Sequence, residues 1–407
     1  MANNTANNTH SQLIYLDGHA TTPLDARVLN AMLPYLTEQF GNSSSQSHRY
    51  GWEAAAAVKQ ARQVLSNAIG ASSDDPSEII FTSGATEANN LALKGIAEAY
   101  FQKGRHLITL QTEHSAVLEP CRYLERLGFE VTYLPVQPDG LLDIHLLAEA
   151  IRPETVLVSV MAANSEIGVL QPLGEIGALC RERGVLFHTD AAQAIGKIPL
   201  DVQAMSIDLM SLTAHKLYGP KGVGALYVRR RPRVQLAAQL HGGGQEQGLR
   251  SGTLATHQIV GFARAVELAD SPEEQEGLAH QRQLRDRLWS ALAPLGGIHL
   301  NGHPTQRLPG SLNVSVEGVD GAALLLSLRS QVAVSSGSAC GSGKTAPSHV
   351  LLALGRDRAL AAASLRFCVG RFNTEAEIDQ VIDQISVTIR ALRLGDFKPR
   401  EIKPKQD

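Results

Sequence analysis

The sequence is poor in cysteine, in aromatic residues and in net charge, and each shortage disfavours a class of protein. Its four cysteines, spread over 407 residues, are too few and too scattered for a disulfide framework, which predicts a reducing, cytoplasmic setting. Aromatic side chains make up 5% of the chain, which disfavours a stacking platform for single-stranded nucleic acid. The formal net charge of −3 gives no general attraction to a phosphate backbone. We therefore expect no direct binding to nucleic acid.

Long apolar runs are also missing. The longest uncharged run, residues 288–306, is interrupted by proline, glycine and histidine, so we expect no membrane span. Residues 1–12 form an Asn/Thr tract without a basic or an apolar region, which predicts a disordered tail rather than a signal peptide. Hydrophobic residues make up 43% of the chain and charged residues 19%, which is typical of a globular protein with two or three domains.

Short apolar runs alternate with amphipathic helical stretches from about residue 79 to residue 228. This alternation predicts an α/β fold, with a mostly parallel seven-stranded sheet covered by helices on both faces. Ligands of such sheets bind where the carboxyl ends of the strands lead into loops. The expected strands are residues 79–82, 106–111, 130–134, 155–161, 185–189, 209–213 and 223–228. The expected helices between them are residues 87–103, 115–127, 144–151 and 173–183.

Shorter alternating elements follow a glycine-rich run at residues 241–252. They predict a second, smaller α+β domain from about residue 265 onward. The expected strands of this domain are residues 311–316, 331–335 and 364–368. The helices expected after the glycine-rich run are residues 257–268, 273–292, 321–328, 347–353 and 374–392.

Three motifs at the ends of expected strands fit one cofactor. Ser83-Gly84-Ala85-Thr86-Glu87 opens a helix with small residues, as a phosphate cup requires. The same residues would also fit an ordinary glycine turn that binds no phosphate. Asp190 ends an apolar strand, and Lys216 follows another, where a lysine either does chemistry or only extends toward solvent. Pyridoxal 5'-phosphate (PLP) needs a Schiff-base lysine, a carboxylate for its pyridine nitrogen and a phosphate cup. Together, therefore, the three motifs predict a PLP site.

Three further side chains are candidates for chemistry. His114 ends another expected strand, where it could lie over a flat ring and transfer protons, or be a buried imidazole without such a role. Arg366 lies inside an apolar strand, which requires an anionic partner, either an internal acid or a substrate carboxylate. Cys340 lies in a loop of small residues and is expected to be exposed, mobile and reactive, whereas Cys121, Cys180 and Cys368 lie in apolar patterns typical of buried thiols.

Other patterns in the sequence disfavour a nucleotide-binding site, a serine hydrolase and a metal site. Gly343-Lys344-Thr345 lacks the earlier glycine of a nucleotide-binding loop, and no G-x-S-x-G elbow of a serine hydrolase occurs. The run of arginines at residues 229–233 is expected to be a solvated strand end. Because no zinc-type motif is present, we expect no metal site.

The chain resembles the fold-type I, class V aminotransferase superfamily of PLP enzymes, and within it the cysteine desulfurases of the NifS/IscS kind. The resemblance covers nearly the whole chain outside the two tails, from Tyr15-Leu16-Asp17 to Gly370-Arg371-Phe372. Its matching stretches include the Thr86 and His114 segments, Phe40-Gly41-Asn42, Asn164-Ser165-Glu166-Ile167-Gly168, His188-Thr189-Asp190-Ala191-Ala192-Gln193, His215-Lys216-Leu217-Tyr218-Gly219-Pro220-Lys221-Gly222, Arg250-Ser251-Gly252-Thr253 and Ser335-Ser336-Gly337-Ser338-Ala339-Cys340.

The resemblance implies a role for each matching residue. Lys216 would hold PLP as a Schiff base, Asp190 would pair with the pyridine nitrogen, and Gln193 would contact the ring hydroxyl. His114 would stack on the ring and transfer protons, and Asn164 would orient the cofactor or the substrate. Arg366 would bind the substrate carboxylate, and Cys340 would attack the substrate sulfur. The phosphate would be held by Ala85, Thr86, Thr213 and His215, with Thr253 reaching in from a partner subunit.

The activity implied by the resemblance is the conversion of L-cysteine to L-alanine. The sulfur would pass as a persulfide on Cys340 to an acceptor for iron–sulfur cluster assembly, another thio-cofactor or tRNA thiolation. The implied partners are a second copy of the chain, as a homodimer, and a sulfur acceptor or iron–sulfur scaffold protein, with which Cys340 could transiently ligate a cluster. A selenocysteine lyase and a class V aminotransferase are the alternatives.

The resemblance also implies a division of the chain. Residues 13–28 would form an N-terminal segment that packs with the small domain, and residues 29–264 the large PLP-binding domain. Residues 265–393 would form the small domain, which carries the catalytic cysteine loop at about residues 330–346. Residues 1–12 and 394–407 would be tails.

Overall fold

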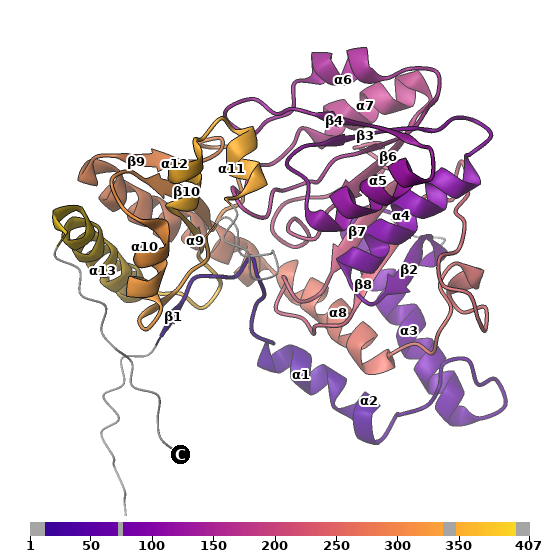
Figure 1. Ribbon diagram of the computed structural model, residues 1–407. Helices are drawn as coiled ribbons and strands as arrows, with labels where there is room; N and C mark the ends of the chain where they lie inside the picture. The colour runs from indigo at the N-terminus through magenta and orange to yellow at the C-terminus, as the bar shows by residue number, and fades with distance from the viewer. Residues whose placement is uncertain (1–12, 72–75, 337–346, 396–407) are drawn as a thin grey trace, which may run out of the picture.

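The computed structural model describes residues 13–71, 76–336 and 347–395, which form a larger and a smaller lobe (Figure 1). A seven-stranded sheet lies at the centre of the larger lobe, in the order β2-β8-β7-β6-β5-β3-β4. All neighbours in the sheet are parallel except β8, which runs antiparallel to both β2 and β7. The expectation of a mostly parallel sheet is therefore confirmed. The strands are β2 (Ile79–Thr82), β3 (His106–Leu110), β4 (Glu130–Leu134), β5 (Thr155–Ser159), β6 (Leu186–Asp190), β7 (Leu209–Thr213) and β8 (Gly224–Val228).

Both faces of this sheet are apolar, because successive side chains of a strand point to opposite sides. Ile79 and Phe81 belong to one buried cluster, and Ile80 between them belongs to another. Helices α4 (Ala85–Ala99) and α5 (Ser115–Arg126) cover one cluster. The helices that contribute to the other are α1 (Ala26–Met32), α3 (Arg49–Ala68), α6 (Ile144–Ala150), α7 (Leu173–Arg183) and α8 (Thr256–Ala269).

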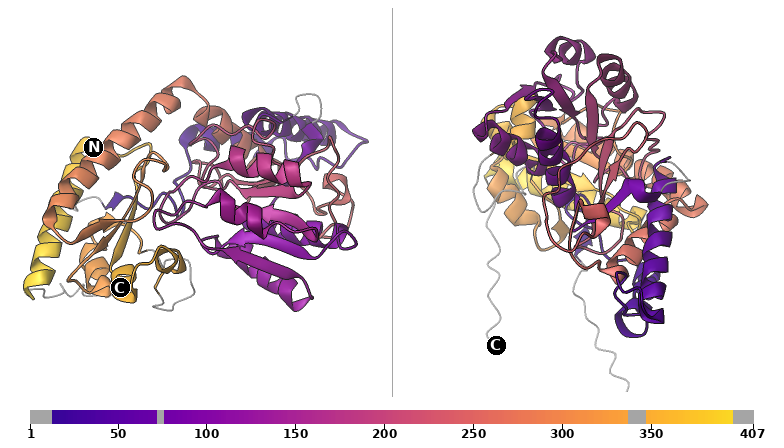
Figure 2. Two further views of the ribbon diagram at one scale, coloured as in Figure 1. Left: turned by 90° about the horizontal axis from the view of Figure 1, so that it is seen from above. Right: turned by 90° about the vertical axis from the view of Figure 1, so that its right-hand side faces the viewer.

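The smaller lobe has its own sheet and its own apolar core. Its strands are antiparallel in the order β12-β10-β9, with bounds β9 (Ile298–Leu300), β10 (Ser311–Val316) and β12 (Ser364–Cys368). Helices α9 (Pro272–Leu292) and α13 (Glu375–Leu394) lie side by side along its outer side (Figure 2). The remaining helices of this lobe are α10 (Gly321–Leu328), α11 (His349–Ala353) and α12 (Arg358–Ala362).

The N-terminal segment belongs to this second core, although it precedes the whole larger lobe in the chain. β1 (Ile14–Tyr15) pairs in parallel with β11 (Val332–Ala333). Ile14 and Leu16 are buried in the same cluster as the inner residues of α9, α10 and α13. The chain therefore passes from the smaller lobe into the larger one at residues 17–25, beside the loops of the large sheet.

Most expected elements are present, with shifts at their ends. β2, β4, β7, β10, β12 and α7 have the expected bounds, whereas α4 begins at Ala85 and ends four residues early, and β11 is shorter than expected. The elements that were not expected from the sequence are β1, α1, α2 (Pro34–Thr37), α3, β9, α12 and the short 3-10 helices Pro76–Glu78, Glu246–Gly248 and Ala293–Leu295. The residue boundaries of the two domains stay predictions. In the described part of the chain, no helix is long and apolar enough to cross a membrane.

Candidate active site

A cavity of about 590 Å³ lies where the strands of the large sheet lead into loops. Loops after β2, β3, β5, β6 and β7 contribute to its walls, which is the edge of the sheet where an α/β fold binds ligands. Residues far apart in the sequence therefore meet here. The predicted site residues that line the cavity are Ala85, Thr86, His114, Asp190, Gln193, Thr213, His215 and Lys216.

The N-terminus of α4 forms one wall of the cavity. Gly84 precedes the helix with φ 154°, a conformation that favours glycine, and Ala85 and Thr86 are the first two helical residues. The backbone N–H groups of a first helical turn lack intrahelical partners and favour an anion. Glu87 does not oppose that anion with free charge, because it pairs with Arg250 at 2.7 Å. This wall suits a phosphate group.

Asp190 is a buried carboxylate at the end of β6. One of its oxygens accepts a hydrogen bond from Asn89 Nδ2 at 2.7 Å, and the other from the Ala192 N–H at 2.9 Å. His188, two residues earlier on the strand, is buried between Ser159 and Ser211, and burial lowers its pKa to about 4. His188 is therefore neutral and brings no charge to Asp190. A carboxylate that two hydrogen bonds hold at the cavity wall suits a protonated ring nitrogen.

Lys216 lies in the turn after β7 and lines the same cavity as Asp190. Its Nζ donates a hydrogen bond to the main-chain carbonyl of His19, a residue of the N-terminal segment. The same carbonyl accepts a hydrogen bond from Gln193 Nε2 at 2.9 Å. The adjacent His215 is neutral, because burial and the charge of Lys216 lower its pKa to about 4.

His114 is the N-cap of α5, and this role determines which ring nitrogen holds its proton. Nδ1 accepts a hydrogen bond from the Ala116 N–H at 3.1 Å, so the neutral ring carries its proton on Nε2. Burial lowers the pKa of His114, and the charges of Lys216 and His349 act in the same direction, against the effect of Asp190. His114 is therefore a neutral imidazole that offers an N–H from Nε2.

Two predicted site residues lie next to the cavity rather than among the residues that line it. Asn164 uses its side chain within the loop after β5: it donates to the Thr112 carbonyl at 3.0 Å and accepts from the Glu166 and Ile167 N–H groups. Arg366 is buried and pairs with Asp17 at 2.7 Å. It also donates to the carbonyl of Ser165, which does line the cavity.

The remaining two predicted residues are not tested by this arrangement. Thr253 is exposed and is not among the residues that line the cavity. Cys340 lies outside the described residues. The other three cysteines are buried, and burial raises the pKa of the Cys121 and Cys180 thiols to about 12. Their burial agrees with the apolar surroundings that the sequence shows for them.

Asp17, His19 and Asn89 contribute to the site, although the sequence analysis gave them no role. Asn89 follows Thr86 by three residues on α4, so helical periodicity carried a signal for it. Asp17 carried none beyond its place in a matching stretch, and His19 carried none. Each meets its partner across more than 140 residues of chain, which only the tertiary fold reveals.

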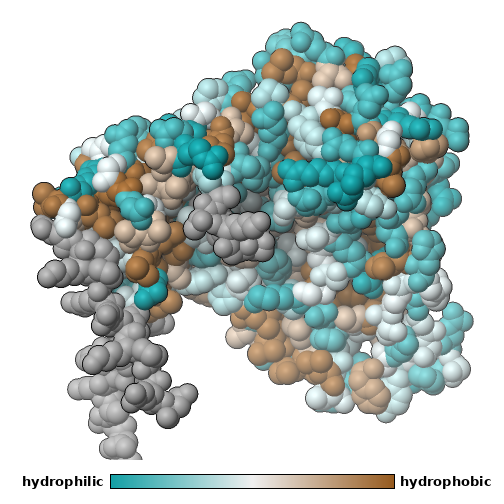
Figure 3. Space-filling view, in the orientation of Figure 1, coloured by the Kyte–Doolittle hydropathy of each residue, from teal (hydrophilic) through white to brown (hydrophobic). Residues whose placement is uncertain are grey.

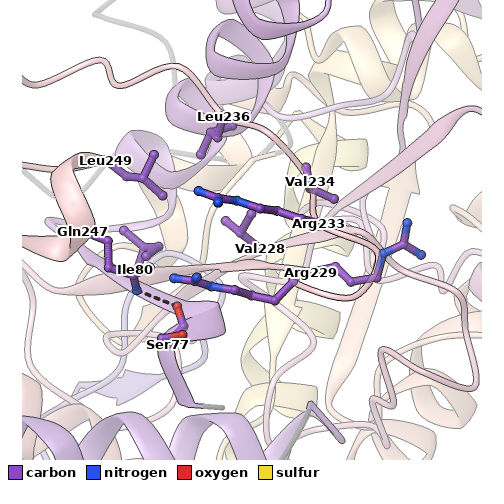
Figure 4. A pocket seen from close by; sticks show the side chains of 10 residues that line it. Ser77, Ile80, Val228, Arg229, Arg233, Val234, Leu236, Gln247 and Leu249 are labelled. Carbon is purple, nitrogen blue, oxygen red and sulfur yellow. Dashed lines mark hydrogen bonds between the residues drawn. The ribbon is translucent and has the colours of Figure 1, made fainter.

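A second cavity, of about 290 Å³, lies at the end of β8 (Figure 4). At its edge Gln247 Nε2 donates a hydrogen bond to the Ser77 carbonyl at 2.8 Å. The expectation of a solvated strand end here needs one correction: Arg229 is largely buried and pairs with Asp208 at 2.6 Å. None of the predicted site residues that the structure describes lines this cavity. Within the same described residues, no cluster of His, Cys, Asp and Glu could hold a metal ion.

The fold and the larger cavity define a PLP-dependent enzyme of fold type I, and comparison with known proteins agrees. The chain belongs to the class V aminotransferase family, which matches residues 14–381. It is 54% identical over 388 residues to a cysteine desulfurase IscS of Photobacterium profundum, covering 95% of this chain and 94% of the relative. It is 55% identical over 388 residues to the IscS of Vibrio campbellii, with the same coverage.

Solved structures agree with this assignment. A NifS-like protein superposes with a TM-score of 0.86 at 39% identity, covering 93% of this chain and all of that one (100%). SspA in complex with cysteine superposes with a TM-score of 0.78 at 39% identity, over 89% of this chain and 100% of the other.

Proposed function

We propose that the chain is a cysteine desulfurase, which converts L-cysteine to L-alanine and keeps the sulfur as a persulfide on Cys340. The observation that carries the proposal is the meeting of Lys216, Asp190 and the α4 N-terminus on one cavity. The relatives that bear the name cysteine desulfurase cover nearly the whole chain, which favours this reaction over others of the family.

PLP fits this cavity by charge and by hydrogen bonding. The first turn of α4, with Thr86, Thr213 and His215, would hold its phosphate, and Asp190 its ring nitrogen. Lys216 would hold it covalently, and Gln193 would contact its ring oxygen. When bound, PLP withdraws electrons from the substrate Cα and so makes the bonds around that carbon labile.

The protein side chains then bind the substrate and move its protons. Arg366 would bind the cysteine carboxylate in exchange for part of its contact with Asp17, and Asn164 would keep the adjacent loop in place. The amine of Lys216, oriented by the His19 carbonyl, would take the proton from Cα. His114 would stack on the ring and donate a hydrogen bond from Nε2, where its N-cap bond leaves the N–H of the neutral imidazole.

Sulfur leaves the substrate by attack of the Cys340 thiolate. A new S–S bond forms to Cys340 while the substrate Cβ–S bond breaks, and the former Cβ gains a proton to give alanine. The balance is L-cysteine plus a thiol giving L-alanine plus a persulfide, without an external oxidant. A second thiol or an iron–sulfur scaffold protein would then take the sulfur from Cys340.

We place the enzyme in the cytoplasm as a homodimer, without nucleic acid or membrane as direct partners. Exposed apolar side chains support a second copy as partner, because they gather on and near α1 and α2 (Figure 3). They include Leu29, Leu33, Leu36 and Phe40. Thr253 would reach the phosphate of the other protomer across this dimer.

An assay of the purified protein with L-cysteine and a thiol reductant tests the proposal. We expect alanine and sulfide in equal amounts from the wild type and from Cys121→Ala, which loses a buried thiol. Cys340→Ala should lose sulfide release almost entirely. If Cys340→Ala made alanine and sulfide at the wild-type rate, the persulfide role would be wrong. Formation of a 2-oxo acid together with a second amino acid would instead identify an aminotransferase. Activity with selenocysteine as the only substrate would identify a selenocysteine lyase.

A further inference from the structure

Lys197 is a partly buried lysine that the proposed reaction does not use. It lines a small void of about 40 Å³ on the far side of Lys216, together with His19 and Cys368. Burial lowers its pKa, and among the described ionisable groups only the Cys368 thiol acts noticeably in the opposite direction. Within the described residues no carboxylate pairs with this partly buried amine, and such desolvation without an ion pair is costly, so this position calls for a function.

The contact that Lys197 makes is with a residue of the candidate active site. Its Nζ donates a hydrogen bond to Gln193 Oε1 at 3.3 Å. The two residues lie four apart in the helical turn that follows β6, where their side chains share one face. Gly196 brings this turn against the Lys216 loop, since a Cβ there would lie 2.4 Å from Leu217 Cδ1.

The two partners of Gln193 determine how its amide is oriented. A protonated lysine only donates and a carbonyl only accepts, so Oε1 must face Lys197 and Nε2 must face the His19 carbonyl. One N–H of the amide then remains without an assigned partner. Because Gln193 also lines the main cavity, this N–H is available to a bound ligand.

We propose that Lys197 is a positioning residue, which orients the Gln193 amide so that it presents an N–H to the ring oxygen of bound PLP. The inference deepens the proposed function and rests on it. A hydrogen bond to that oxygen, when it is anionic, draws charge away from the neighbouring nitrogen of Lys216 and makes protonation of that nitrogen harder. Loss of Lys197 should therefore raise the pH at which bound PLP changes colour.

The visible absorbance of the PLP-bound protein, titrated with pH, tests this inference. We expect Lys197→Met to raise the midpoint by about one pH unit. Lys197→Arg keeps a cationic donor, so its midpoint should stay near that of the wild type. The control Lys103→Met, which changes an exposed lysine that contacts the Gly184 carbonyl, should also keep the wild-type midpoint. We also expect Lys197→Met to change kcat more than KM, since Arg366 and not Gln193 binds the substrate carboxylate.

A second background separates positioning from a direct effect of the lysine charge. In Gln193→Leu the amide is gone, so adding Lys197→Met should shift the midpoint little further. A full additional shift in that background, or an unchanged midpoint in Lys197→Met alone, would overturn the inference. A wild-type protein that showed no visible PLP absorbance would contradict the proposed function itself, and this inference with it.

Discussion

At the scale of single residues, burial is what prepares the side chains of the cavity for chemistry. His114, His188 and His215 are all kept neutral by burial, whereas the carboxylate of Asp190 is held by two hydrogen bonds. Burial also raises the pKa of Glu113 well above its usual value, next to His114. The neutral histidines leave Asp190 as the carboxylate that a cationic ring nitrogen would meet, in a cavity that it shares with Lys216.

The lowered pKa of His114 predicts the acid limb of the pH profile. His114 stays neutral until the pH falls below its lowered pKa. The loss of kcat at low pH should therefore begin below pH 6.5, the ordinary pKa of histidine. His349→Phe removes a neighbouring charge that lowers this pKa, and should move the limb to higher pH. The measurement is kcat against pH for the wild type, His349→Phe and the exposed control His280→Phe. An acid limb that did not move in His349→Phe would contradict this electrostatic coupling.

At the scale of elements, the helix starts and strand ends supply the site. Asp190 and Thr213 are the last residues of β6 and β7, His114 caps α5, and Thr86 lies in the first turn of α4. Each polar side chain is fixed by an element whose apolar residues are buried in the two large clusters. The geometry of the site therefore depends on the packing of the sheet rather than on its loops alone.

The first turn of α4 should contribute to PLP affinity through a side chain as well as its backbone. Thr86→Val removes a hydroxyl donor to a charged phosphate, which is worth roughly 1.5–3 kcal/mol. We expect PLP to bind this variant about tenfold to a hundredfold more weakly. Equilibrium titration of the apoprotein with PLP measures this, with the exposed Thr37→Val as the control. An affinity equal to that of the control would show that Thr86 does not touch the phosphate.

A pair of side chains joins the two lobes beside the cavity. Ser348, the N-cap of α11, donates a hydrogen bond to Glu166 in the loop after β5. Burial raises the pKa of Glu166 to about 7, although Ser348 and Arg366 act in the opposite direction. The folded protein thus binds this proton more tightly than the unfolded chain does.

This raised pKa predicts that stability falls as the pH rises. The contribution of protonated Glu166 is present below the unfolded pKa of about 4.3 and is lost as the pH rises through about 7. Glu166→Gln cannot lose that proton, so between pH 5 and pH 8 it should lose roughly 2 kcal/mol less stability than the wild type. Urea unfolding at the two pH values measures the difference, with the exposed Glu38→Gln as control. Parallel losses in wild type and Glu166→Gln would contradict the assigned pKa.

At the scale of the whole molecule, the N-terminal segment and the two cores determine how the lobes meet. Asp17 and His19 lie between them, where Asp17 pairs with Arg366 of the small sheet and the His19 carbonyl meets Lys216 of the large lobe. The candidate site is therefore complete only when both cores have formed.

The apolar surface of α1 and α2 predicts the oligomeric state. We expect a homodimer, and we expect Leu36→Glu, which charges an exposed leucine of this surface, to shift it toward the monomer. Val387→Glu charges another exposed apolar residue, on α13, and should leave the dimer intact. Light scattering across a range of concentrations measures the mass. A dimer in both variants would show that α2 lies outside the interface.

The sequence was informative where chemistry and periodicity coincide in one short stretch. The strands of the large sheet, the α4 motif, Asp190 and Lys216 could be predicted because apolar runs end directly in polar residues. α3 could not, since its apolar side is built largely of alanine, whose small side chain gives little contrast. The partners of Lys216 and Arg366 depend on contacts across about 200 and 350 residues, for which a single sequence holds no pattern.

The central claim is that sulfur from L-cysteine becomes bound to Cys340. The most direct test is mass spectrometry of peptides from PLP-bound protein that has reacted with L-cysteine and then with an alkylating agent, without reductant. We predict one additional sulfur atom on the peptide that contains Cys340, formed together with one alanine per chain. Alanine formation with the additional sulfur on Cys368, or with no sulfur on any cysteine, would contradict the account.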